Sequence, residues 1–178
     1  MKLLLLTGSS TSGKNTLANL LLKDRSFAQI ITCTSRPRRP EEKGDEYYFL
    51  SKRDFSDKSR FFEMENNHGN YYGLLKSELS SKLKSKKKLI YILDPKGAYK
   101  LMTRLRKCLP KDTISVFLTP GKEVLINRIR MERKGNVAAR IKSVEKEFKI
   151  LERGKFDYIL DTGCEISESL KNLKRLVS

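Results

Sequence analysis

The sequence is poor in the residues that most metal sites and hydrolases use. It has one histidine, three cysteines and no tryptophan among 178 residues. The single imidazole, His68, excludes metal sites built from several histidines, and no GxSxG elbow is present for a Ser/His/Asp hydrolase. Cys33, Cys108 and Cys164 are dispersed and form no CxxC pair, so neither a disulfide framework nor a zinc ribbon is expected. This cysteine usage is typical of a reducing, cytoplasmic location.

Long hydrophobic runs are also missing. The apolar opening Leu3–Leu6 is interrupted at once by Thr7-Gly8-Ser9-Ser10, far short of the ~20 apolar residues that a membrane span needs and too short for a signal-peptide core. Hydrophobic residues make up 38% and charged residues 33% of the chain, which excludes both a membrane protein and a disordered chain. We expect a single domain over residues 1–178, with no membrane association.

Positive charge is abundant. Lys and Arg number 38 against 21 Asp and Glu, a formal net charge of +17, so the natural ligand carries negative charge. Phosphate groups and nucleic acid both fit, but the sequence shows no RNP motif or zinc finger, and nucleic acid is therefore the weaker hypothesis. The lysine-rich run 82–88 is expected to be a solvated helix end and loop.

Short apolar runs alternate with helical patterns along most of the chain. The runs predicted as strands are Leu3–Leu6, Ile30-Ile31, Leu89–Leu93, Ile114–Leu118 and Tyr158–Leu160. Helical spacing follows at Leu17, Leu20 and Leu21, and over Tyr99–Cys108, Glu123–Arg133, Val137–Leu151 and Ile166–Val177. This alternation predicts an α/β fold with a doubly wound parallel sheet, whose core comprises roughly residues 1–33, 77–120 and 154–178.

Residues 34–76 break this rhythm. The segments Phe61–Glu65 and Asn70–Gly73 are separated by a turn-like stretch and predict a small antiparallel hairpin. We place the insertion above the edge where the parallel strands end, because ligands of open α/β sheets bind there.

The segment from Gly8 to Thr16 fits the Walker A spacing GxxxxGK and lies between a predicted strand and a predicted helix. In such a loop the backbone N–H groups and the helix N-terminus face an anion, and the lysine reaches the β and γ phosphates. A triphosphate is the implied ligand. Its predicted binding residues are Gly8, Ser9, Ser10, Thr11, Ser12, Gly13, Lys14, Asn15 and Thr16.

Asn15 stands where the pattern expects a hydroxyl for Mg²⁺. Thr16 follows immediately, and the Asn15 carbonyl oxygen is itself a suitable ligand for a hard cation, directly or through water. Magnesium binding is therefore still expected.

A second anion site is indicated by Arg36 and Arg39, which flank a proline-containing loop, since arginine suits bidentate phosphate recognition. The segment Thr34–Phe49 resembles the guanylate kinase signature, with a loop one residue shorter. The resemblance continues in order along nearly the whole chain, at Phe61-Phe62-Glu63, Gly69–Gly73, Leu93–Gly97, Phe117–Pro120 and Phe156–Tyr158.

The resemblance implies a P-loop nucleoside monophosphate kinase that uses ATP and Mg²⁺ to phosphorylate GMP or dGMP. Glu63 would contact the guanine base, and Asp94 would lie near the metal and the acceptor. The resemblance also implies a helical lid over roughly residues 128–140, which carries Arg128. The residues implied to hold the acceptor phosphate are Thr32, Arg36, Arg39, Tyr47 and Tyr72, and those implied to act on the transferred phosphoryl group are Lys14, Arg130, Arg133 and Arg140.

Three positions depart from the family pattern. Leu74 replaces a Ser or Thr that contacts the base, Ile92 replaces an Asp two residues before Asp94, and Thr11 replaces a loop glycine. Substituting Leu74 by Ser is therefore expected to strengthen GMP binding.

Two alternatives remain open. Leu74 and Asn15 are also typical of related kinases that phosphorylate ribose 1,5-bisphosphate, although Glu42, Tyr47 and Glu63 argue against that substrate. The other alternative is a non-catalytic guanylate-kinase-like binding module. The intact loop from Gly8 to Lys14 argues against this.

Overall fold

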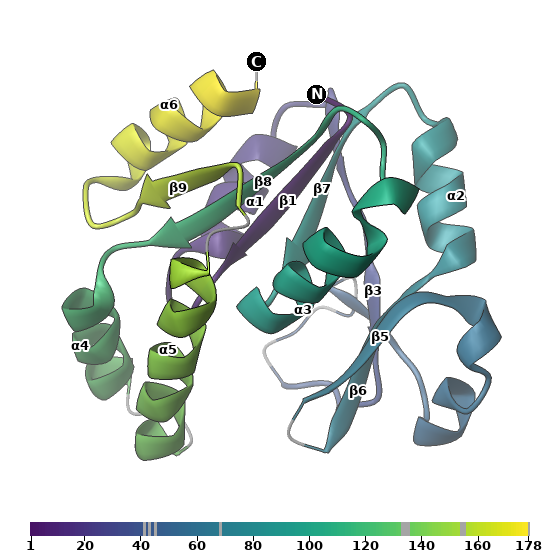
Figure 1. Ribbon diagram of the computed structural model, residues 1–178, viewed down its shortest axis with the longest axis horizontal. Helices are drawn as coiled ribbons and strands as arrows, with labels where there is room; N and C mark the ends of the chain where they lie inside the picture. Colours follow the sequence, from purple (N-terminus) through teal and green to yellow (C-terminus); the bar gives the residue numbers. More distant parts are fainter. Residues whose placement is uncertain are drawn as a thin grey trace.

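Two β-sheets form the framework of the protein (Figure 1). The computed structural model describes residues 1–40, 42, 44, 46–67, 69–132, 136–153 and 156–177. The larger sheet is parallel throughout, as predicted. Its order is β2 (Phe27–Gln29), β7 (Lys88–Leu93), β1 (Leu3–Gly8), β8 (Thr113–Thr119) and β9 (Tyr158–Asp161).

The central strand β1 is buried along its whole length. Leu4 and Leu6 pack in one apolar cluster, and Leu3 and Leu5 pack in another. Successive side chains of a strand point to opposite faces, so these two clusters are the two faces of the sheet. Both faces are covered, which explains the uninterrupted apolar run.

Helices cover the two faces as a doubly wound sheet requires. The helices are α1 (Lys14–Leu22), α2 (Lys76–Lys84), α3 (Pro95–Lys100), α4 (Lys122–Glu132), α5 (Val137–Glu152) and α6 (Ile166–Val177). α1 and α6 contribute to the cluster around Leu4, whereas α2 and the turns that follow α3 contribute to the cluster around Leu5. α4 and α5 pack together through Leu125, Ile129 and Val144 and lie to one side of the sheet (Figure 1).

The smaller sheet has the order β4 (Tyr47–Phe49), β3 (Thr32–Thr34), β6 (Asn70–Leu75) and β5 (Phe61–Asn67). β5 and β6 form the predicted antiparallel hairpin. β4, however, pairs with β3 in parallel, so the sheet is mixed rather than antiparallel. It lies across from the α4–α5 pair, beyond the carboxyl ends of β1 and β7 (Figure 1).

The predicted strand at Ile30-Ile31 is wrong. β2 ends at Gln29 and β3 begins at Thr32, so these two residues are the crossover from one sheet to the other. The Ile30 amide still donates to the Ile90 carbonyl, and the Ile31 amide donates to the Glu78 carboxylate at 3.0 Å. Burial of Ile30 explains the apolar pattern without a strand.

The helix predicted over Tyr99–Cys108 begins earlier, at Pro95. Asp94 caps it by accepting a hydrogen bond from the Gly97 amide, with proline in the first turn, which is a strong start signal. A π turn over Leu101–Leu105 and a 3-10 turn over Arg106–Cys108 follow. The lysine-rich run begins inside α2, a helix of which the sequence indicated only the end. In the described part of the chain, no helix is long and apolar enough to span a membrane.

Candidate active site

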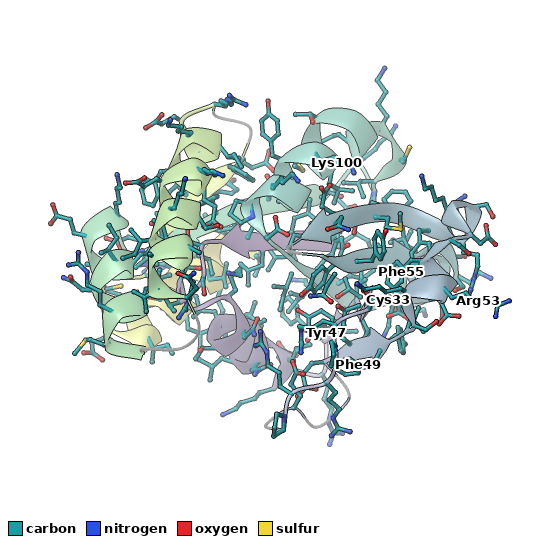
Figure 2. The ribbon with its side chains drawn as sticks, turned by 90° about the horizontal axis from the view of Figure 1, so that it is seen from below. Cys33, Tyr47, Phe49, Arg53, Phe55 and Lys100 are labelled. Carbon is teal, nitrogen blue, oxygen red and sulfur yellow. The ribbon has the colours of Figure 1, made fainter. Side chains whose placement is uncertain are left out.

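Two neighbouring cavities lie at the carboxyl ends of β1 and β7. A cavity of about 280 Å³ is lined by Lys14, Glu63 and Asp94, among others, and so lies between the larger and the smaller sheet. A cavity of about 720 Å³ shares Asn15 and Thr32 with it. Tyr47 also lines both cavities. In Figure 2, Tyr47 lies on the side of the smaller sheet nearest the centre of the molecule, whereas Arg53 projects at the far end of that sheet.

The loop from β1 to α1 has the geometry of a phosphate-binding loop. A Cβ at Gly8 would come within 2.3 Å of the Leu118 carbonyl oxygen, so only glycine fits there. Gly13 (φ 89°) and Thr11 (φ 64°) adopt left-handed backbone conformations. Glycine adopts that conformation without strain, but a β-branched residue does not. Thr11, which stands where the family pattern has a glycine, is therefore strained.

The Lys14 ammonium group folds back onto this loop and donates to the carbonyl oxygens of Gly8 at 2.8 Å and Ser9 at 2.7 Å. Burial lowers the pKa of Lys14 to about 8, and the carboxylates of Glu147 and Asp94 act in the opposite direction. A partly buried cation whose charge is only partly compensated attracts an anion such as a phosphate group.

Several hydroxyl groups in and beside the loop are unsatisfied. In the described part of the chain, the buried side-chain oxygens of Thr7, at the end of β1, and of Thr11 and Ser12 have no hydrogen-bond partner. Buried polar groups are normally paired, so these unpaired hydroxyls indicate a place that a polar ligand completes.

The helix pair α4–α5 contacts the same loop. Arg140 donates to the Ser10 hydroxyl at 3.0 Å, and Arg128 donates to the carbonyl oxygens of Thr11 at 3.2 Å and Thr162 at 3.3 Å. Arg128 therefore reaches the phosphate-binding loop more directly than its neighbour Arg130, which is exposed. Residues two positions apart in a helix are separated by about 200° around its axis, so the side chains of Arg128 and Arg130 leave α4 in different directions. Arg133 lies outside the described residues.

A carboxylate that we did not single out from the sequence also faces this loop. On α5, Arg140, Ser143 and Glu147 are spaced to lie along one face. Ser143 donates to Glu147 at 3.0 Å. Burial raises the pKa of Glu147, whereas the hydroxyl groups of Ser9 and Ser143 and the ammonium group of Lys14 act in the opposite direction. The polar face of α5 formed by these three residues of the helix was the sequence pattern that could have indicated Glu147.

The arginine-containing loop after β3 holds Arg36 rigidly. Its guanidinium group forms a bidentate ion pair with Glu42, at 2.5 and 3.1 Å, and lies over the rings of Tyr47 and Phe49. The Glu42 carboxylate also accepts from the Arg39 amide at 2.7 Å, and the Arg39 side chain is exposed. Tyr47 packs edge-on against Tyr72. Of the predicted acceptor residues, Thr32, Tyr47 and Tyr72 line the smaller cavity, whereas Arg36 contacts it through Tyr47 and Arg39 lines neither of the two cavities.

Glu63 lies on β5 and is largely buried at the wall of the smaller cavity. Its carboxylate accepts a hydrogen bond of 2.6 Å from the Tyr91 hydroxyl. Burial raises the pKa of Glu63, although Tyr91 and the Lys100 ammonium group lower it.

Leu74 is paired with Glu63 across the β5–β6 hairpin, but it belongs to the core of the protein. It is 1% exposed and packs with Leu3, Leu5 and Tyr91. A hydroxyl at position 74 would therefore face apolar side chains, which changes the expectation for Leu74→Ser.

We expect Leu74→Ser to lower the free energy of unfolding by about 2–5 kcal/mol, since it removes a buried side chain and buries a hydroxyl group. Urea unfolding measures this change. The control is Leu74→Met, which conserves volume and should cost less than about 1.5 kcal/mol. Equal stability of the serine variant and the parent protein would contradict the placement of Leu74 in the core.

Oxygen ligands suited to Mg²⁺ are present at the mouth of the smaller cavity. Asp94 and Asn15 are both exposed there, close to Lys14. One oxygen of Asp94 accepts from the Gly97 amide at 2.9 Å, which leaves the other oxygen for a cation. Thr16 is exposed on the next position of α1 but does not line this cavity. Among the described residues, no group of three or more His, Cys, Asp or Glu could hold a metal ion by itself.

Comparisons with known proteins identify the family of the chain. The protein-family model described as Guanylate kinase matches residues 1–178. The guanylate kinase of Mycoplasma mobile is 32% identical over 97% of this chain and 91% of its own length. That of Bartonella quintana is 37% identical over 66% of this chain, and the match spans only 53% of that longer protein. The crystal structure of guanylate kinase from Anaplasma phagocytophilum superposes with a TM-score of 0.74 at 24% identity, covering 98% of this chain and 83% of that one. The phosphate-binding loop and the Glu63 carboxylate thus line one cavity, and the arginine-containing loop contacts it through Tyr47. The family model matches every residue, and the chain belongs to the guanylate kinase family.

Proposed function

We propose that the protein transfers the γ-phosphoryl group of ATP to GMP or dGMP. The observation that carries this proposal is that Lys14 of the phosphate-binding loop and Glu63 of the smaller sheet line the same cavity. A donor phosphate at the first residue and an acceptor base at the second would place the two nucleotides on opposite sides of the reacting phosphoryl group.

On the donor side, the loop over residues 8–16 binds the phosphates of ATP. The Lys14 ammonium group would exchange its two loop carbonyls for the β and γ phosphates, because charged phosphate oxygens are stronger acceptors. Arg140 and Arg128 already contact the loop, so the pair α4–α5 acts as the lid that supplies positive charge, together with Arg130 and Arg133 as further candidates.

On the acceptor side, Glu63 selects the base. An ionised carboxylate accepts from both N1–H and the exocyclic amine of guanine, whereas adenine does not present two donors at that edge. Arg36, Arg39, Tyr47 and Tyr72 hold the acceptor phosphate, and Thr32 lies on the adjoining strand. The Arg36–Glu42 pair fixes one guanidinium group before the phosphate arrives.

Mg²⁺, when bound, would neutralise charge on the phosphate oxygens of ATP, with Asp94 and Asn15 as its protein ligands and Thr16 as a further candidate. Asp94 and Asn15 line the same cavity as Lys14. Two protein oxygens suffice because Mg²⁺ in such sites takes most of its ligands from phosphate and water.

The transfer itself needs little acid or base chemistry. The attacking group is a phosphate oxygen that is already ionised near neutral pH, because its second pKa is about 6. Positioning and charge therefore do the catalytic work, which Lys14 and the lid arginines supply as the phosphoryl group moves in line toward the acceptor. This chemistry requires no histidine nucleophile or base.

We propose a cytoplasmic location, where ATP and GMP occur and where the three free cysteines would stay reduced. We also propose that the chain acts as one domain, with roughly residues 34–76 as the acceptor-binding insertion and roughly residues 128–140, in the α4–α5 pair, as the lid.

An ADP-release assay with Mg-ATP against a panel of acceptors tests the proposed function. The panel contains GMP, dGMP, AMP, CMP, UMP and ribose 1,5-bisphosphate. We expect the highest kcat/KM with GMP or dGMP. Turnover of ribose 1,5-bisphosphate alone would assign the protein to the related sugar-phosphate kinases, and nucleotide binding without ADP release from any acceptor would indicate a binding module.

A further inference from the structure

Tyr91 places its hydroxyl group at the candidate base-binding carboxylate from outside the acceptor insertion. It lies on β7 of the larger sheet, is 1% exposed, and packs with Leu5, Leu74 and Leu101. Its hydroxyl donates to the Glu63 carboxylate over 2.6 Å, across 28 positions of sequence. A buried tyrosine needs a partner for its hydroxyl, and here that partner is the one carboxylate proposed to contact guanine.

The position opposite Glu63 in the hairpin cannot give the same support. Leu74 is the paired residue on β6 and has no hydrogen-bond donor in its side chain. The backbone of Gly73 approaches so closely that a Cβ there would lie 2.9 Å from the Glu63 carbonyl oxygen. The hairpin therefore positions the backbone of Glu63, while the orientation of its carboxylate depends on a contact from the other sheet.

We propose that Tyr91 is a specificity-determining positioning residue, which fixes the Glu63 carboxylate in the orientation that accepts both guanine donors. This proposal rests on the proposed function, since it assigns Glu63 to the base. An ionised carboxylate has about four acceptor positions. One bond from Tyr91 to one oxygen therefore leaves the second oxygen and a further lone pair free for N1–H and the exocyclic amine.

The hydrogen bond can orient the Glu63 carboxylate because Tyr91 is held firmly in the larger sheet. Tyr91 lies on β7 between β2 and the central strand β1, is paired with Leu5 of β1, and is packed in an apolar cluster. Glu63 belongs to the smaller sheet, whose β5 also meets α3 through the ion pairs of Glu65 with Lys96 and Lys100. The hydrogen bond therefore ties the base-contacting group to the same sheet that carries the phosphate-binding loop, so both nucleotides are positioned from one framework.

The test is Tyr91→Phe, which removes one oxygen atom and keeps the packed ring. We expect the KM for GMP to rise about tenfold, which corresponds to about 1.4 kcal/mol. The kcat with GMP, the KM for ATP and the kcat/KM for AMP should change by less than about twofold, because the hydroxyl acts only on base recognition. The control is Tyr158→Phe, which removes the same atom from an exposed position on β9 of the same sheet and should change none of these values.

A double-mutant cycle with Glu63→Ala separates positioning from a general structural effect. In the Glu63→Ala protein there is no carboxylate to orient, so adding Tyr91→Phe should leave the KM for GMP unchanged. If Tyr91→Phe weakens GMP equally in both backgrounds, or weakens ATP as much as GMP, the proposal is overturned.

Calorimetric binding of GMP keeps this test separate from the test of the proposed function. If the parent protein binds GMP without transferring phosphate to it, the proposed function fails, yet the same tenfold weakening by Tyr91→Phe would still support the role of Tyr91. If the parent protein phosphorylates GMP and Tyr91→Phe leaves both KM and binding unchanged, the proposed function stands and the role of Tyr91 fails.

Discussion

Lys14→Ala should lower the kcat for phosphoryl transfer by about 10²- to 10³-fold, the usual cost of removing one preorganised charge from the transition state. The ammonium group donates to two loop carbonyls, from which it can turn to the β and γ phosphates. Its removal takes a charge out of a partly buried place and removes no part of either apolar core. We therefore expect the variant to unfold at nearly the same temperature as the parent protein.

The matched control is Lys23→Ala, which removes an exposed lysine just beyond the other end of α1 and should leave kcat unchanged. The pH profile gives a second measurement. Because burial lowers the pKa of Lys14 to about 8, the group loses its charge as the pH rises through that value, and kcat/KM for ATP should fall there. The alanine variant should lack this alkaline limb. Substantial turnover by Lys14→Ala would contradict the phosphate-binding role of the loop.

The parallel sheet and the phosphate-binding loop could be predicted from the sequence because their signals are local. A buried strand, two glycines and a lysine at fixed spacing lie within twelve residues, from Leu3 to Lys14. The family pattern added the acceptor residues, and the structure brings Arg36, Tyr47 and Tyr72 together. Local signals failed at Ile30-Ile31, where burial in a crossover produced the same apolar pattern as a strand.

Other functional contacts depend on residues far apart in the sequence. Tyr91 lies inside an apolar run that predicts only a buried strand, and its meeting with Glu63 follows from how the two sheets pack. Glu147 was not singled out from the sequence either, because it is one of many charged residues on a basic, amphipathic helix. Leu74 shows the reverse case, because a position that the family pattern assigns to the base belongs in this chain to the core.

The substrate preference gives the second large effect. Glu63→Gln should lower the ratio of kcat/KM for GMP to that for AMP by about 10- to 100-fold for each hydrogen bond to the charged group that is lost. The Tyr91 hydroxyl donates to one oxygen of the side chain, so the amide oxygen of the glutamine should take that place and its NH₂ group should face the base. An NH₂ group opposes the donors of guanine but can donate to N1 of adenine, so use of AMP should rise while use of GMP falls.

The pH dependence tests the same residue independently of the substitution. Burial raises the pKa of Glu63 above its ordinary range, so this carboxylate takes up a proton at a higher pH than a free glutamate does. Protonation of the acceptor phosphate, whose second pKa is about 6, lowers kcat/KM for GMP and AMP alike. The ratio of kcat/KM for GMP to that for AMP should therefore decline on mild acidification, whereas the same ratio for the glutamine variant should not change. Glu168→Gln, at an exposed position in the first turn of α6, is the matched control and should leave the GMP to AMP ratio unchanged. A Glu63→Gln variant that keeps both the preference for GMP and its decline on acidification would place base recognition on other residues.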